Sequence, residues 1–199
     1  MAMIRILVQR VMIAYSFFVE SMGVALLKQF FADAVFYPTL WWSMLLARKL
    51  KVRNWWDDVN EHIVLGAYPF DVDVARLAQE GVTAVVNTCQ EYAGPVAEYE
   101  KHSISQLRIP TIDFTHPSFE DVERAVEFMD RQIASGGRIY VHCKAGRARS
   151  ATVVACWLIK NRKMTADAAQ QFLLSKRSHV NRRLALRPVV QQFEQSYTR

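Results

Sequence analysis

The chain has 199 residues, a formal net charge of +6 and 51% hydrophobic residues. This length predicts one domain with an N-terminal extension, and a core of about 150 residues can bury enough apolar surface without disulfides. The three cysteines, Cys89, Cys143 and Cys156, are odd in number, widely spaced and without metal-ligand spacing. We therefore expect no metal, and a thiol chemistry would disfavour secretion because the thiol must stay reduced.

Residues 1–53 are expected to form a targeting or membrane-associating segment that ends in a basic linker. Arg5 and Arg10, with no acidic residue through position 19, fit a mitochondrial presequence or anchor, although the apolar run also resembles a secretory signal. Charged residues interrupt the apolar stretch, so we expect an interfacial amphipathic segment, with Trp41 and Trp42 at the interface, rather than a clean span. A tilted span, or packing on the domain's own core, remains as an alternative.

Residues 54–199 alternate strand-like and helix-like segments and are expected to form the catalytic domain. The predicted strands are residues 62–67, 82–87, 106–112 and 138–142, and the predicted helices are residues 72–79, 119–135, 149–161, 166–176 and 185–196. Ser118 and Thr165 are predicted N-caps. This alternation predicts an α/β fold with a mostly parallel central sheet that helices cover on both faces.

The stretch between the last predicted strand and the next helix, residues 142–150, is the most informative part of the chain. A cysteine lies six residues before an arginine, with a glycine between them, in a strand-to-helix frame where backbone N–H groups can surround an anion. We predict that this stretch binds a phosphate group. The predicted loop comprises His142, Lys144, Ala145, Gly146, Arg147, Ala148 and Arg149.

Cys143 is the predicted nucleophile, since a helix N-terminus and nearby cations lower the pKa of a thiol. Arg149 can hold two phosphate oxygens with its planar fork, and Ser150 can donate a hydrogen bond to the sulfur. His142 is expected to fix the loop through hydrogen bonds. The alternative is that Cys143 is a buried structural cysteine. The presence of a histidine, a glycine, an arginine and a serine around it disfavours that alternative.

Asp113 is the predicted general acid, because thiolate attack expels an alkoxide that needs a proton. It follows a strand-like run and precedes a loop, where catalytic groups collect in open α/β sheets. Glu120, Asp121 and Asp130 are the other carboxylates considered, and their place on a helix favours a solvated face instead.

Cys143, Arg149, Ser150 and the upstream Asp113 resemble the protein tyrosine phosphatase superfamily in its dual-specificity branch, where the acid precedes the cysteine loop. A closer resemblance, from about residue 34 to the C-terminus, is to the mitochondrial phosphatases that act on phosphatidylglycerophosphate. It rests on Val35-Phe36-Tyr37-Pro38-Thr39-Leu40, Trp55-Trp56, Ile63-Val64-Leu65-Gly66-Ala67, Thr111-Ile112-Asp113-Phe114-Thr115, the cysteine loop and Lys176-Arg177-Ser178-His179.

This resemblance implies the cysteine-based dual-specificity phosphatase fold, conversion of phosphatidylglycerophosphate to phosphatidylglycerol in the cardiolipin pathway, and no metal or other cofactor. It also implies a place on the matrix side of the inner mitochondrial membrane. The family's acidic, tyrosine-containing motif matches Glu91 and Tyr92 as candidate substrate-binding residues, although Gln90 stands where an acid is expected.

The positive charge is concentrated in the last third of the chain. Residues 144–199 contain twelve Lys or Arg against Asp167 and Glu194. A basic surface around an anion-binding loop suits an anionic phospholipid and a membrane surface as partners. No nucleic-acid motif accompanies the charge, so nucleic acid is not an expected partner.

Three rival functions stay open at this stage. The first is a dual-specificity protein phosphatase, because a fold does not determine its substrate. The second is a phosphoinositide phosphatase, because Cys143-Lys144-Ala145-Gly146-Arg147 resembles the basic loop of such enzymes. The third is a membrane-bound pseudophosphatase, which the presence of Cys143, Arg149 and Asp113 disfavours.

Overall fold

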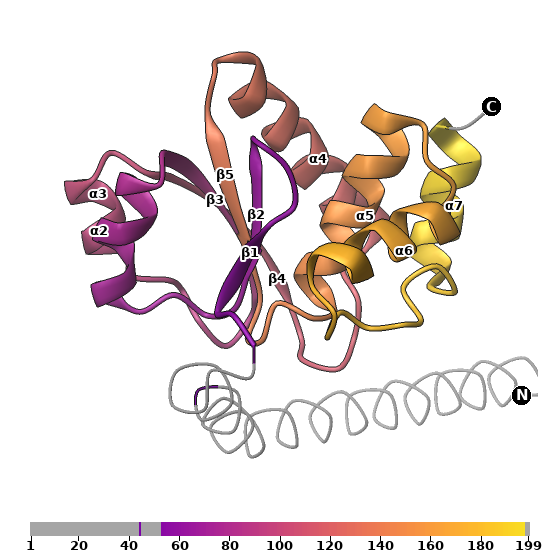
Figure 1. The fold of residues 1–199 in the computed structure, drawn as a ribbon, viewed down its shortest axis with the longest axis horizontal. Helices are drawn as coiled ribbons and strands as arrows, with labels where there is room; N and C mark the ends of the chain where they lie inside the picture. Colours follow the sequence, from indigo (N-terminus) through magenta and orange to yellow (C-terminus); the bar gives the residue numbers. More distant parts are fainter. Residues whose placement is uncertain (1–43, 45–52, 198–199) are drawn as a thin grey trace, which may run out of the picture. The chain divides into compact units, whose positions relative to one another are not determined.

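Five strands form one sheet in the order β1-β2-β5-β3-β4. The computed structural model describes residue 44 and residues 53–197 (Figure 1). Strand β1 (Trp56–Asp58) pairs antiparallel with β2 (Ile63–Gly66), and the pairs among β2, β5 (Arg138–His142), β3 (Val82–Cys89) and β4 (Ser105–Thr111) are parallel. The prediction of a mostly parallel sheet is confirmed.

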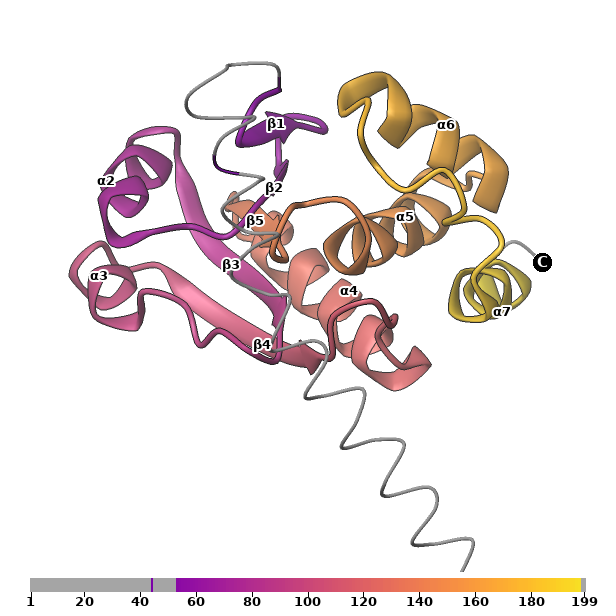
Figure 2. The ribbon, with the colours of Figure 1, turned by 90° about the horizontal axis from the view of Figure 1, so that it is seen from below.

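Helices cover both faces of this sheet, as predicted (Figure 2). Helices α2 (Asp71–Gln79) and α3 (Val96–Lys101) lie on one face. The other face carries α4 (Phe119–Ala134), α5 (Arg149–Arg162), α6 (Ala166–Lys176) and α7 (Pro188–Tyr197). The parallel strands β3, β4 and β5 end at the same edge of the sheet. The segments that follow these three strands therefore lie close together.

The central strands of the sheet contribute side chains to two separate hydrophobic cores, one on each face of the sheet. In β5, Ile139 and Val141 pack in the larger core beneath α4–α7, whereas Tyr140 packs in the smaller core beneath α2 and α3. The alternation follows from the period of two along a strand. Helix α5 is buried along Arg149–Ile159, so its N-terminus, which follows the cysteine loop, is firmly anchored.

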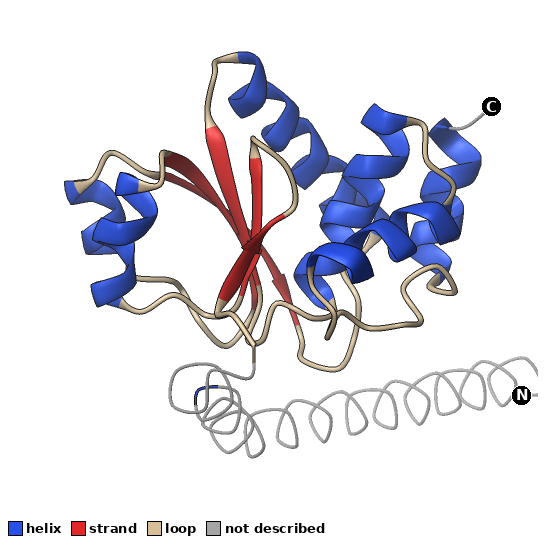
Figure 3. Cartoon of the chain, viewed as in Figure 1, coloured by secondary structure: helices blue, strands red, loops and turns tan. Residues whose placement is uncertain are grey.

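The elements agree with the sequence prediction except at two short segments and one helix start (Figure 3). The predicted N-caps are confirmed, since Ser118 accepts from the Asp121 N–H and Thr165 from the Ala168 N–H. Strand β1 and helix α3 were not predicted, because three and six residues carry too little periodic signal. Helix α7 begins at Pro188 rather than near residue 185, where proline's fixed φ suits the first turn.

The predicted N-terminal targeting or membrane segment, and with it the predicted boundary at residues 53 and 54, lies almost wholly outside the described residues. Among the residues that are described, no helix has both the length and the apolar character that crossing a membrane requires.

Candidate active site

The residues predicted to bind phosphate lie at the carboxyl end of the central strand β5. Cys143 follows β5 directly and is 4% exposed, and α5 begins six residues later at Arg149. No side chain caps α5 at Ala148, so the first N–H groups of this helix are available to an anion. The tight strand–loop–helix connection thus places a thiol at a helix N-terminus.

The environment of Cys143 favours a thiolate. The Ser150 hydroxyl donates a hydrogen bond to the sulfur at 3.3 Å. Burial by itself raises the pKa of this thiol, but the Arg149 charge, the Ser150 hydroxyl and the N–H groups of Ser150 and Ala148 outweigh it and lower the pKa from 9.0 to about 7. A large fraction of Cys143 is therefore ionised near neutral pH and ready to act as a nucleophile.

Arg149 is held in place by its own network and is 1% exposed. Its Nη1 and Nη2 donate to the two carboxylate oxygens of Glu91 at 2.9 and 2.7 Å, and Nη1 also donates to the Thr111 carbonyl at 2.8 Å. A bidentate pair of this kind fixes the guanidinium plane. Glu91, predicted as a candidate substrate-binding residue, therefore lies where it orients the arginine that is predicted to bind phosphate.

Asp113 lies in the same site, after β4. Its carboxylate forms an ion pair with Lys144 and contacts Arg149 Nη2 at 3.1 Å. Phe114 follows with a φ of 64°, which is strained for a side chain of this size, and its ring is 66% exposed. A phosphate bound by Arg149 would thus have the Asp113 carboxyl group beside it.

The rival acids of the sequence analysis lie elsewhere. Asp121 is the N3 residue of α4, where it pairs with Arg124 at 2.9 Å. Asp130 accepts hydrogen bonds from Trp157, Lys160 and the side chain of Asn161 on α5. These contacts give Asp121 and Asp130 structural partners. Of the predicted acids, Asp113 is the one that contacts Arg149 within the described part of the chain.

His142 and Tyr92 both make hydrogen bonds to neighbouring segments of the domain. His142 was expected to fix the loop through hydrogen bonds, and its ring is not the group that makes them, since both ring nitrogens are buried without a partner among the described residues. It is the His142 carbonyl that accepts a bond, from the Thr88 hydroxyl at 2.9 Å. Burial lowers the imidazole pKa to about 3, so the ring is neutral. Tyr92 donates to the Pro69 carbonyl at 2.5 Å and stacks on Tyr68, which fixes the segment beside Glu91.

The conformation of the loop depends on Gly146 and on an arginine outside the loop. Gly146 has a φ of 62°, and a Cβ there would lie 2.4 Å from the Gly66 carbonyl oxygen. Arg177, which is 2% exposed, donates to the carbonyls of Gly146 at 3.0 Å and Ala145 at 3.2 Å and pairs with Asp57 at 2.5 Å. With these carbonyls bound on the outer side, the loop's N–H groups are free to turn inward.

Arg177 entered the sequence analysis only as part of a resembling segment, with no role assigned. Nothing in its local pattern marks it, because its partners are 31 and 120 residues away. Arg147, predicted as part of the loop, turns its side chain to the connection between α6 and α7, where Nε donates to the His179 carbonyl at 2.8 Å. Within the described part of the chain, no cluster of three His, Cys, Asp or Glu side chains suits a metal ion.

Comparison with known proteins gives a consistent picture. The model of the dual specificity phosphatase catalytic domain matches residues 63–196. Phosphatidylglycerophosphate phosphatase PTPMT2 of Arabidopsis thaliana is 38% identical over 162 residues, or 80% of this chain and 71% of the relative. The human phosphatidylglycerophosphatase and protein-tyrosine phosphatase 1 is 31% identical over 87% of this chain and 91% of its own. A crystal structure of PTPMT1 in complex with PI(5)P has a TM-score of 0.68 at 32% identity, covering 73% of this chain and 97% of that chain.

Proposed function

This chain belongs to the dual-specificity phosphatase family and is a phosphoric monoester hydrolase, and we propose that its substrate is phosphatidylglycerophosphate, which it converts to phosphatidylglycerol. The observation that carries the chemistry is a Cys143 thiol whose pKa is lowered by the Arg149 charge, with the Asp113 carboxyl group in contact with that guanidinium. The proposed substrate rests on the relatives that match most of this chain, because their names state that substrate.

In the first step, the Cys143 thiolate attacks the phosphorus atom and the ester P–O bond breaks. Arg149 and the loop N–H groups hold the non-bridging oxygens, where charge stabilisation contributes most because the transition state is loose. Asp113 gives its proton to the departing glycerol oxygen, which leaves as an alcohol. The phosphoryl group is then bound to sulfur.

In the second step, the Asp113 carboxylate takes a proton from water as the water oxygen attacks phosphorus. The S–P bond breaks, inorganic phosphate leaves, and the thiolate returns. The Ser150 hydroxyl, 3.3 Å from the sulfur, stabilises the departing thiolate. The chain supplies the nucleophile, the acid–base group and the hydrogen-bond donors of both steps, and water supplies the proton that restores Asp113, so the proposed cycle uses no cofactor.

The place of action is the mitochondrion, at the matrix side of the inner membrane, and the cardiolipin pathway consumes the product. The resemblance of the N-terminal residues to a presequence or anchor supports this, as does the concentration of cations in residues 144–199, which suits an anionic lipid surface.

The test is a comparison of substrates with purified protein. Hydrolysis of phosphatidylglycerophosphate in vesicles is measured beside a phosphotyrosine peptide and a phosphatidylinositol monophosphate. We expect kcat/KM for phosphatidylglycerophosphate to exceed both. A preference for the peptide would replace the proposal by a protein phosphatase, and a preference for the inositol lipid would replace it by a phosphoinositide phosphatase. Cys143→Ser is the inactive control.

A further inference from the structure

Two arginines and a histidine form a second polar group beside the phosphate-binding loop. Its members come from three segments: Arg53 precedes β1, Arg147 belongs to the loop, and His179 follows α6. The hydrogen bond from Arg147 Nε to the His179 carbonyl joins two of these segments. Arg177 joins the third, because its Nη1 donates to the carbonyl of Asn54, the residue after Arg53, at 3.3 Å.

The charges in this group are only partly compensated. Arg177 is paired with Asp57, but neither Arg53 nor Arg147 forms an ion pair with a carboxylate among residues 53–197. The same charges act on one another. Burial, then Arg147 and Arg177, lower the pKa of Arg53, and burial together with the three arginines lowers the pKa of His179 to about 3. Like charges held this close repel each other, and an anion between them would relieve that repulsion.

His179 adds an unsatisfied polar atom to the group. Its Nε2 is buried and has no hydrogen-bond partner within the described part of the chain. A buried ring nitrogen without a partner costs free energy, and a neutral imidazole can donate from Nε2 to an anionic oxygen. The group therefore combines two forked cations with one buried donor, which is the chemistry that recognises a phosphate oxygen.

We propose that Arg53, Arg147 and His179 form a second anion subsite that binds the phosphodiester of the same glycerophospholipid whose monoester is held at Cys143. The inference rests on the proposed function and deepens it. Arg147 belongs to the loop whose amides would hold the monoester, and its side chain contacts the His179 segment. In phosphatidylglycerophosphate, one glycerol unit separates the two phosphates. The subsite thus distinguishes this lipid from a phosphorylated side chain, which carries no second phosphate at that spacing.

The experiment uses soluble substrates, so that membrane charge plays no part. Deacylated phosphatidylglycerophosphate carries both phosphates, whereas glycerol 3-phosphate carries only the monoester. The readout is the ratio of kcat/KM for these two compounds, measured on the same protein, so a general loss of activity cancels. For Arg53→Gln combined with Arg147→Gln we expect this ratio to fall about tenfold or more, the effect of losing charge-assisted hydrogen bonds.

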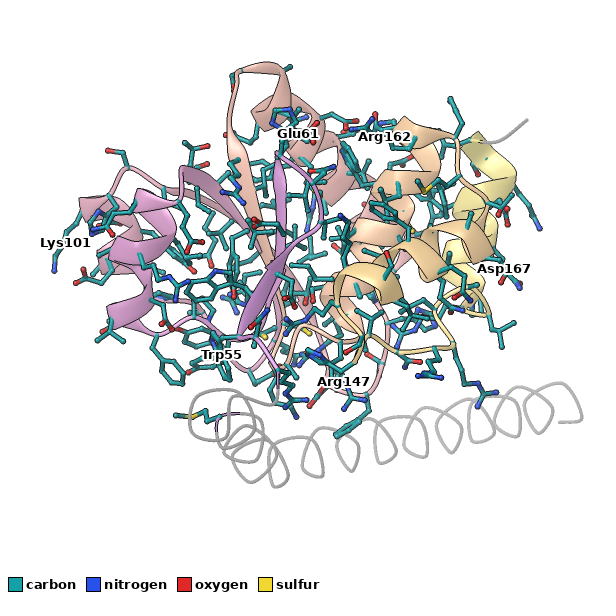
Figure 4. All side chains as sticks on the ribbon, viewed as in Figure 1. Trp55, Glu61, Lys101, Arg147, Arg162 and Asp167 are labelled. Carbon is teal, nitrogen blue, oxygen red and sulfur yellow. The ribbon has the colours of Figure 1, made fainter. Side chains whose placement is uncertain are left out.

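Two further variants make the result specific. Arg53→Gln alone leaves the cysteine loop untouched and should lower the ratio severalfold, which tests the subsite even if the double variant is unstable. Arg162→Gln is the matched control, because Arg162 is also a surface arginine but lies at the opposite end of the domain from Arg147 (Figure 4). Its ratio should equal that of the wild type.

The outcomes separate the subsite from its rivals. An unchanged ratio in both Arg53 variants would overturn the proposal, and so would a loss seen only with lipid vesicles, since that pattern belongs to attraction by the membrane surface. The same measurements isolate the proposed function. If the wild type hydrolyses neither phosphatidylglycerophosphate nor its deacylated form, the proposed function fails, whereas hydrolysis with an insensitive ratio rejects the subsite alone.

Discussion

Arg177 offers the sharpest test of how the fold shapes the phosphate-binding loop. Its guanidinium is buried and bonds the carbonyls of Ala145 and Gly146 on one side and the Asp57 carboxylate on the other. Arg177→Met removes the charge and all donors while keeping an unbranched apolar chain of similar length. The partly buried Asp57 carboxylate then loses its ion-pair partner, and the loop carbonyls lose their donors.

The magnitude follows from these contacts. Removing one member of a buried ion pair typically lowers the free energy of unfolding by about 3–5 kcal/mol, because the remaining charge is uncompensated. That is a large part of the 5–15 kcal/mol that stabilises a typical domain. Removing both charges, in Arg177→Met combined with Asp57→Leu, should restore at least about 1 kcal/mol relative to Arg177→Met alone, since no unpaired charge then remains at this position.

Urea unfolding measures the free energy, and the rate of alkylation by iodoacetamide as a function of pH measures the Cys143 pKa. In Arg177→Met we expect the pKa to rise above about 7, because a relaxed loop no longer aims the Ser150 and Ala148 N–H groups at the sulfur. Arg162→Met, which removes an exposed pair with Glu61 at 3.5 Å, is the control and should cost less than about 1 kcal/mol. A loss below about 1 kcal/mol in Arg177→Met, with an unchanged thiol pKa, would refute the reasoning.

Other predictions follow from the same site. The rate at which iodoacetamide alkylates Cys143 in the wild type should rise with pH through about 7, because only the deprotonated thiol reacts; Ser150→Ala should move that rise upward by roughly one pH unit, because it removes a hydrogen bond to a charged sulfur, and an unmoved profile would contradict the assignment. Asp113→Asn should lower turnover of phosphatidylglycerophosphate about 10²–10⁴-fold and that of an activated aryl phosphate much less, so equal losses in parallel assays would exclude Asp113 as the proton donor. Glu91→Gln keeps the shape but weakens the bidentate pair with Arg149, and we expect KM for phosphate esters to rise in steady-state kinetics, with an unaltered KM counting against an orienting role.

Much of the central sheet could be predicted because its signals are local. Strand β5 is a short apolar run, α5 is a long one, and Ser118 and Thr165 mark helix starts by their own side chains. Strand β1 escaped prediction because its three residues are polar or aromatic and take their strand conformation from pairing with β2. A strand of this kind exists only once its neighbour is in place.

The sequence predicted which side chains lie near the site better than it predicted which atoms those side chains contact. The sequence placed Glu91 and Tyr92 near the substrate, and the structure puts one against Arg149 and the other against Pro69. For His142, the sequence predicted hydrogen bonds without specifying the atoms, and the structure shows that the main-chain carbonyl accepts one from Thr88. Such outcomes depend on which atoms lie opposite across the sheet, which no local pattern encodes.

By itself, the sequence determined the chemistry of the loop, because a thiol, a glycine and a forked cation at this spacing before a helix are set by adjacent residues. Only the tertiary structure decided what surrounds that loop. Glu91, Asp113 and Arg177 are 58, 36 and 28 residues from Arg149 along the chain, and they meet because parallel strands end at one edge and α6 returns the chain to the same place. Orientation and charge balance depend on these long-range contacts, which exist only after the sheet has formed.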